Sequence, residues 1–195
     1  MFIGISGPTC SGKSTVCGYL TGRFPKIALV PLDNFFVDRQ YYPMYEGFVN
    51  MDHPDGVRFE LFIDMLRRLK KGEEVQAPVY DLAHSKIAGT TTVQLSEIMM
   101  FEGLFLFFRP EIRDMLDVKI YLDLPVAAQR NRRLERNLHS DPLYFDRVVV
   151  PMYERYLLGT KQHSDYIVNA DRPIDAVATE ITGILEYHFA RAHNA

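Results

Sequence analysis

The stretch G-P-T-C-S-G-K-S-T at residues 7–15 matches all four fixed positions of the phosphate-binding pattern G-x-x-x-x-G-K-[ST]. Gly7 and Gly12 let the backbone turn tightly enough to direct successive N–H groups at a polyphosphate. Lys13 supplies a cation for the β- and γ-phosphates, and the Ser14 hydroxyl is a suitable ligand for Mg²⁺. The stretch therefore predicts a loop that binds nucleotide phosphates.

The residues on either side of this loop fit the strand–loop–helix order that such loops require. The apolar run at 2–6 is typical of a buried strand. A helix is expected from Thr15 to about Gly22, with its N-terminal dipole directed at the bound anion. The predicted nucleotide-binding residues are Gly7, Thr9, Cys10, Ser11, Gly12, Lys13, Ser14 and Thr15.

The composition favours one compact domain over residues 1–195. Hydrophobic residues make up 47% of the 195, enough for a substantial core. The net charge of −3 gives no general attraction to nucleic acid or membranes, and Glu102 interrupts the most apolar stretch at 98–108. Because Cys10 and Cys17 are the only cysteines and the first strand leaves no room for a signal peptide, we expect a cytoplasmic protein. A homo-oligomer is compatible with the sequence.

Strands and helices alternate along the rest of the chain. Further buried strands are expected at 26–31, 98–101, 118–122 and 166–168, and helices at 58–71, from 125, at 143–158 with a disturbance at Pro151, and at 174–192. Residues 33–57 are expected to form a long aromatic connection, and 73–94 short strands around 78–80 and 91–93 with a loop between them. This order predicts the three-layer α/β/α fold of a P-loop NTPase with a central parallel sheet. A substrate-binding insertion is expected at about 33–96 and a short helical lid at about 130–145.

Two acids follow the second and third strands, where the carboxyl ends of parallel strands form the usual binding edge. Asp33 and Glu102 could hold Mg²⁺ with Ser14, and Asp33 could accept the proton of an attacking hydroxyl. Either acid alone could equally be a solvated carboxylate or a helix cap. The nearby arginines at 132, 133 and 136 fit either a solvated helix face or a lid over the transferring phosphoryl group.

Four segments resemble the uridine kinase family of phosphate-loop nucleoside kinases, which includes the nicotinamide riboside kinases. They are the phosphate loop, L-D-N-F-F at 32–36, N-M-D-H-P-D at 50–55 and P-V-Y-D-L-A-H-S at 78–85. F-E-G-L at 101–104 and the arginine segment extend the resemblance over about residues 1–170.

The resemblance implies a role for each matching residue. Asp33 would be the catalytic base and, with Ser14 and Glu102, a metal ligand, while Lys13, Arg133 and Arg136 would act on the transferring phosphate. Asp52 would bind the ribose hydroxyls, and Tyr80 and His84 the base. Phe36 and Arg132, in the matching aspartate and arginine segments, are assigned to the substrate site as well.

Some positions depart from the uridine kinase pattern and leave the base open. Met51 stands where an aromatic is usual, and Leu82 where a phenylalanine is common. The segment D-P-L-Y-F-D-R-V-V-V-P-M-Y-E-R-Y at 141–156 is more similar to the nicotinamide riboside kinases. A GTPase-like switch is the alternative of another class, since T-K-Q-H at 160–163 approaches the guanine-reading pattern [NT]-K-x-D.

The expected function is transfer of the γ-phosphate of ATP, with Mg²⁺, to the 5′-hydroxyl of a ribonucleoside. Uridine or cytidine is the preferred acceptor and nicotinamide riboside the alternative. The sequence does not distinguish ATP from GTP as the donor.

Overall fold

The computed structural model describes residues 1–24, 26–136 and 141–193, and its centre is a five-stranded parallel sheet. The strand order is β2-β7-β1-β8-β9, with every neighbouring pair parallel. The strands are β1 (Phe2–Ser6), β2 (Ile27–Pro31), β7 (Ile98–Glu102), β8 (Val118–Asp123) and β9 (Tyr166–Asn169). All five predicted strands are present, so the predicted central parallel sheet is confirmed.

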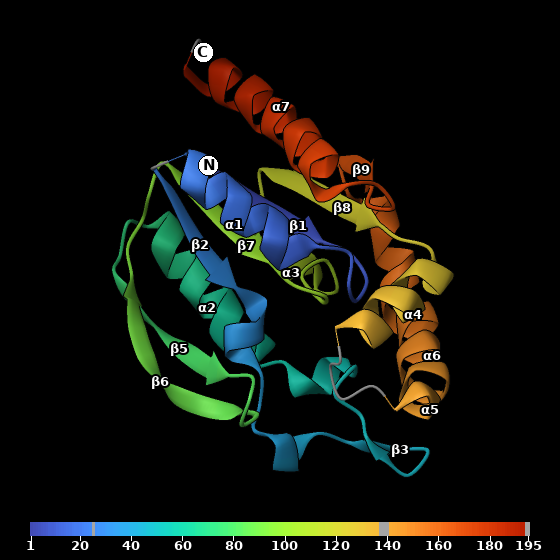
Figure 1. Cartoon of the computed structure of the whole chain (residues 1–195). Helices are drawn as coiled ribbons and strands as arrows, with labels where there is room; N and C mark the ends of the chain where they lie inside the picture. The colour runs from blue at the N-terminus through green and yellow to red at the C-terminus, as the bar shows by residue number, and fades with distance from the viewer. Residues whose placement is uncertain (25, 137–140, 194–195) are drawn as a thin grey trace.

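Helices cover both faces of this sheet (Figure 1). One face packs against α1 (Lys13–Arg23) and α7 (Ile174–His193), and the other against α2 (Phe59–Lys70) and the short α3 (Pro110–Arg113), which the sequence did not predict. The alternation along β1 shows why: Ile3 and Ile5 join the α1/α7 core, whereas Phe2 joins the α2 core. The three-layer α/β/α prediction is confirmed.

The long connection after β2 carries short elements instead of being irregular throughout. It contains 3₁₀ turns η1 (Leu32–Phe35), η2 (Arg39–Tyr41) and η3 (Pro54–Gly56), and the small antiparallel pair β3 (Met44–Tyr45) and β4 (Phe48–Val49). Elements of two to four residues produce no hydrophobic period, so pattern reasoning cannot find them.

Residues 75–93 form one antiparallel hairpin of β5 (Val75–Asp81) and β6 (Lys86–Val93), with a four-residue turn at 82–85. The sequence predicted only short strands around 78–80 and 91–93 with a loop between them. That prediction is wrong in the length of both strands. The full length of β6 is not visible in the sequence, because Thr90, Thr91 and Thr92 face solvent and give no apolar alternation. In Figure 1 this hairpin lies on the opposite side of the molecule from helices α4–α6.

The segment after β8 is helical almost throughout. Helix α4 (Val126–Glu135) carries the arginines, and the predicted lid residues 137–140 lie outside the described part of the chain. A further helical rod then runs through α5 (Pro142–Tyr144), a π-helical stretch (Phe145–Val149), α6 (Val150–Met152), a second π-helical stretch (Tyr153–Leu157) and a 3₁₀ end (Leu158–His163). Pro151 lies in α6, between the two π-helical stretches, and has no N–H to donate to the helix. The predicted disturbance of the helix at Pro151 is therefore present as a change in hydrogen-bonding pattern on either side of it.

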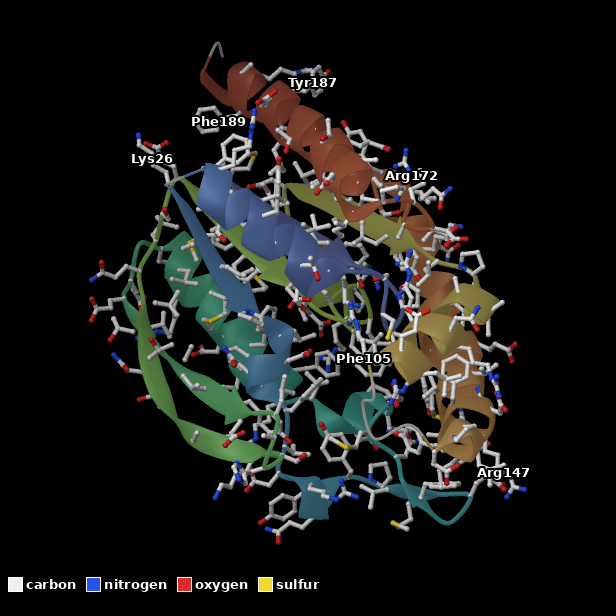
Figure 2. The ribbon with its side chains drawn as sticks, viewed as in Figure 1. Lys26, Phe105, Arg147, Arg172, Tyr187 and Phe189 are labelled. Atoms are coloured by element: carbon white, nitrogen blue, oxygen red, sulfur yellow. The ribbon has the colours of Figure 1, made fainter. Side chains whose placement is uncertain are left out.

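Figure 2 shows where side chains lie relative to these layers. Phe105 is buried in the middle of the molecule, whereas Lys26 and Arg172 lie at its periphery. None of the helices that the structure describes combines the length and apolar character needed to cross a membrane.

Candidate active site

The phosphate loop has the backbone geometry that its two glycines allow. Gly7 has φ +151° and Gly12 φ +90°, and a side chain on Gly7 would place its Cβ 2.5 Å from the Leu122 carbonyl oxygen. The Lys13 ammonium lies across the loop, donating to the carbonyl oxygens of Gly7 (3.0 Å) and Pro8 (2.9 Å). The first turn of α1 begins at Lys13, two residues earlier than predicted, so its unpaired N–H groups lie within the loop.

Two acids and a hydroxyl gather at the carboxyl ends of β2 and β7. Ser14 Oγ donates to Glu102 Oε1 at 2.9 Å. Burial raises the pKa of Asp33 to about 7, assisted by repulsion from Glu102 and opposed by the Lys13 ammonium. Burial likewise lowers the pKa of Lys13, although attraction to Glu102 and Asp33 opposes this. The Lys13 ammonium, held by the loop carbonyl oxygens, is thus electrostatically coupled to both carboxylates of the cluster.

The chemistry of this donor set fits Mg²⁺. Ser14, Asp33 and Glu102 present a hydroxyl and carboxylate oxygens, the ligand types that Mg²⁺ prefers. Within the described residues there is no group of three or more histidines, cysteines or acids able to hold a metal by itself. The site therefore suits an ion that shares its ligands with substrate phosphates and water, as Mg²⁺ commonly does.

A cavity of about 640 Å³ opens onto the phosphate loop, the acids, the β2–α2 connection, the hairpin turn and helices α4 and α5. It brings together most of the predicted site residues. They are Thr9, Cys10, Gly12, Lys13, Ser14, Thr15, Asp33, Phe36, Asp52, His84, Glu102, Arg133 and Arg136. Two of the other predicted residues, Gly7 and Ser11, belong to the loop without lining the cavity.

The two remaining predicted residues, Tyr80 and Arg132, do not line the cavity. Tyr80 is buried, donates its hydroxyl to the Val37 carbonyl oxygen (3.1 Å) and sets its ring edge against Phe36 at 5.7 Å between centroids. Tyr80 thus supports the wall that Phe36 forms, and its contact with a base stays a prediction.

Arg132 is likewise engaged by the protein. Its guanidinium donates to the carbonyl oxygens of Cys10 (3.4 Å) and Ala170 (2.9 Å), so it braces the phosphate loop against the end of β9. The same guanidinium lies 3.7 Å from Asp171 Oδ1, and a contact of Arg132 with the substrate stays a prediction.

The predicted sugar-binding acid has a partner that the sequence did not reveal. Asp52 is 8% exposed, and its Oδ2 accepts a hydrogen bond of 2.9 Å from the Tyr144 hydroxyl. The same hydroxyl accepts from the Met51 N–H at 3.0 Å. Arg133 lies over the Tyr144 ring at 5.6 Å and donates to Thr9 Oγ1 at 3.1 Å. Side-chain contacts thus join the phosphate loop, α4, α5 and the β2–α2 connection.

Sequence reasoning missed four polar residues of this cavity: Arg39, Ser85, Asp141 and Tyr144. Tyr144 lies in the 141–156 segment, whose resemblance to nicotinamide riboside kinases was the available signal. No sequence signal marks Arg39, because it lies in the long β2–α2 connection, whose short elements show no hydrophobic periodicity.

His84 stands at the hairpin turn with its orientation fixed by a carboxylate. Its Nδ1 lies 2.6 Å from Asp81 Oδ2, and the hydrogen bond from the His84 side chain is the main cause of the lowered pKa of Asp81. Asp81 Oδ1 also accepts from the N–H groups of Ala83 and His84. The ring therefore presents its other nitrogen, Nε2, for binding.

Comparison with known proteins agrees with this geometry. Residues 2–173 match the model of the family described as "Phosphoribulokinase / Uridine kinase family". The Uridine-cytidine kinase B of Dictyostelium discoideum is 32% identical over 181 residues, covering 85% of this chain and 73% of that protein. A Uridine kinase of Clostridium botulinum is 33% identical over 179 residues, covering 86% of this chain and 87% of that protein.

Solved structures share the fold. A structure from Bacillus stearothermophilus, described as a possible uridine kinase, has a TM-score of 0.66 at 23% identity and covers 86% of this chain and 87% of its own. The shikimate kinase of Acinetobacter baumannii has a TM-score of 0.60 at 13% identity, covering 96% and 93%. With the family match over most of its length and relatives above 30% identity, this chain belongs to the phosphoribulokinase / uridine kinase family.

Proposed function

We propose that this protein is an ATP- and Mg²⁺-dependent kinase that phosphorylates the 5′-hydroxyl of uridine or cytidine. The observation that carries the proposal is the single cavity in which a phosphate loop, the Asp33–Glu102 acid pair and the buried Asp52 all meet. The relatives named uridine kinase and uridine-cytidine kinase support the choice of acceptor. In this proposal residues 33–96 supply the acceptor half of a single domain and 130–145 the lid.

In the proposed reaction the 5′-oxygen attacks the γ-phosphorus while the bond to the β–γ bridging oxygen breaks. Asp33 accepts the hydroxyl proton as general base. Burial raises its pKa to about 7, and a bound cation would lower it again. Lys13 and the cavity-lining Arg133 and Arg136 offset the charge on the transferring group and the departing ADP. Mg²⁺ held by Ser14, Asp33 and Glu102 would neutralise part of the phosphate charge.

The GTPase-like alternative is not supported by the segment that raised it. Lys161 donates to Asp123 Oδ2 at 2.6 Å, and the segment 160–163 lies in a 3₁₀ helix before β9 instead of forming a loop after a strand. Its lysine is therefore committed to holding the end of β8.

The Arg39 guanidinium favours a neutral base over the cationic ring of nicotinamide riboside, although Asp52 and Asp141, which also line the cavity, attract cations. Arg39 lines this part of the cavity, and within the described residues no carboxylate lies at ion-pair distance from its guanidinium. Asp81, the acid that could have attracted a cationic ring, is already occupied by His84 and two backbone N–H groups. Guanidinium and imidazole groups suit the carbonyl and amino edge of a pyrimidine.

The proposal is tested by ADP release from the purified protein with ATP, Mg²⁺ and a panel of uridine, cytidine, 2′-deoxyuridine and nicotinamide riboside. Uridine or cytidine should be the best acceptor. The 2′-deoxynucleoside should have kcat/KM lower by about 10- to 150-fold, because it leaves the Asp52 carboxylate short of a partner. Equal use of both sugars would remove Asp52 from this role, and ADP release without any acceptor dependence would contradict a nucleoside kinase.

Reversing the charge of Arg39 should shift the choice of base. Arg39→Glu is expected to lower kcat/KM for uridine and raise it for nicotinamide riboside, changing their ratio at least about tenfold, since unit charges some 8 Å apart interact by about 2 kcal/mol at an effective dielectric constant near 20. The control is Arg147→Glu, the same charge reversal at an exposed residue at the edge of the molecule (Figure 2). A ratio that moves equally in both variants would show that net charge, and not Arg39, sets the preference.

A further inference from the structure

We infer that Tyr144 is a positioning residue for the acceptor sugar: its hydroxyl holds the Asp52 carboxylate in the orientation that receives the ribose hydroxyls. The inference rests on the proposed nucleoside kinase function and assigns the sugar selectivity to a second residue. Tyr144 belongs to α5, far along the chain from the Asp52 segment, yet their side chains lie 2.9 Å apart.

The hydroxyl of Tyr144 has a fixed role as a donor to this acid. Burial, together with the charge of Asp52, raises the pKa of Tyr144, so the phenol keeps its proton at neutral pH. Its oxygen accepts from the Met51 N–H at 3.0 Å, which fixes the direction of its own O–H towards Asp52 Oδ2 at 2.9 Å. A donor that is itself a hydrogen-bond acceptor is polarised and held more firmly.

The Asp52 carboxylate depends on this hydrogen bond for its orientation. Within the described residues, Tyr144 is the only group that donates to the carboxylate, while the Asp52 N–H is bound by Asn50 Oδ1 at 3.1 Å. With Oδ2 engaged, Oδ1 is the oxygen with all of its acceptor capacity left for a sugar hydroxyl. Without the phenol, this buried carboxylate could rotate and would bind the sugar with a less defined geometry.

The ring of Tyr144 is anchored separately from its hydroxyl. Phe48 meets it edge-on at 5.6 Å between centroids, and the Arg133 guanidinium lies over it at 5.6 Å. Removing the oxygen alone should therefore leave the ring in place, which makes Tyr144→Phe a clean substitution.

The chain offers a matched control in Tyr156→Phe. The Tyr156 hydroxyl makes a hydrogen bond of 2.9 Å to His53 Nε2, so it joins the same helical rod to the residue that directly follows Asp52. Each variant removes one tyrosine hydroxyl that makes a hydrogen bond to the segment at Asp52 and His53. Only Tyr144→Phe removes the hydrogen bond that the Asp52 carboxylate accepts.

Steady-state kinetics of both variants with uridine and 2′-deoxyuridine, together with melting temperatures, test the inference. Tyr144→Phe should raise KM for uridine about tenfold, as expected for loss of a hydrogen bond to a charged group, with kcat within about threefold of the original. The preference for uridine over 2′-deoxyuridine should fall by a similar factor of about ten. Tyr156→Phe should leave that preference unchanged even if it lowers the melting temperature as much.

A double-substitution cycle with Asp52→Ala separates this role from general packing. In the Asp52→Ala background, which has no side-chain oxygen to accept from the phenol, adding Tyr144→Phe should have little further effect on KM or on sugar preference. Unchanged sugar preference in Tyr144→Phe, or additive effects in the cycle, would overturn the inference while leaving the kinase assignment intact. Failure of the unsubstituted protein to phosphorylate any nucleoside would instead reject the proposed function.

Discussion

Replacing Asp33 with asparagine should lower kcat by at least about 10²-fold, the low end of the contribution of a general base. Asparagine keeps the size and part of the hydrogen bonding but cannot accept the hydroxyl proton. It also removes one of the carboxylates suited to Mg²⁺ beside Ser14 and Glu102. Nucleotide binding should survive, because Lys13 and the loop N–H groups are unchanged.

The same substitution should stabilise the protein at and above neutral pH. The folded state raises the pKa of Asp33 from its ordinary 3.8 to about 7, so the folded protein binds this proton more tightly than the unfolded chain does. Stability from this group is therefore lost as the pH rises from about 4 to about 7. A shift of roughly three units corresponds to at most about 4 kcal/mol, and water in the cavity reduces that figure.

Melting curves without nucleotide or Mg²⁺ measure this effect. Asp33→Asn should melt about 3–8 °C above the unsubstituted protein at pH 8. The difference should vanish near pH 4, where both forms are neutral. Asp64→Asn, at an exposed position on α2 outside the cavity, is the control for losing one charge. Near-normal turnover in Asp33→Asn would contradict its role as the base, and a lower melting temperature at pH 8 would contradict the raised pKa.

The parallel sheet and the nucleotide half of the site could be predicted because local sequence determines them. A run such as residues 2–6 is buried on both faces and is apolar throughout, and the phosphate loop needs its glycines and lysine at fixed spacing. Asp33 and Glu102 followed from their positions at strand ends, without any knowledge of packing.

The acceptor half could not be predicted to the same depth, because tertiary contacts decide it. Nothing local marks Tyr144 as the partner of Asp52, since 92 positions separate the two residues along the chain. Tyr80 is a case in which a local motif was present and tertiary packing still decided the contacts. The Tyr80 hydroxyl donates to the Val37 carbonyl oxygen, and Phe36, which packs against the Tyr80 ring, lines the cavity.

Replacing Lys13 with methionine should reduce both ATP binding and turnover, with kcat lower by about 10²–10³-fold, as for other preorganised groups that stabilise developing charge. Methionine fills a similar space without the ammonium. The loss should exceed that of one phosphate contact, because Lys13 also opposes the rise in the pKa of Asp33. Without it, the free enzyme would keep more of its base in the protonated form at neutral pH.

Lys13→Arg distinguishes the charge of this residue from its fit. The ammonium lies between the carbonyl oxygens of Gly7 and Pro8, at 3.0 and 2.9 Å, where a planar guanidinium has a different shape and donor geometry. Arginine should therefore retain more ATP affinity than methionine does, yet recover little turnover. Calorimetric titration with a non-hydrolysable ATP analogue and coupled measurement of ADP release give the two quantities separately.

Lys161→Met is the matched control for removing a lysine from the carboxyl edge of the sheet. Lys161 is also partly buried and paired with a carboxylate, Asp123, but it lies outside the cavity. Lys161→Met should keep kcat within about threefold of the original, because the Lys161–Asp123 pair lies outside the cavity. It should also destabilise the fold little, since solvent-exposed ion pairs contribute about 1 kcal/mol or less to stability. If Lys13→Met and Lys161→Met lost similar activity, the loss would reflect damage to the sheet edge. A large loss confined to Lys13 would place its charge on the transferring phosphate.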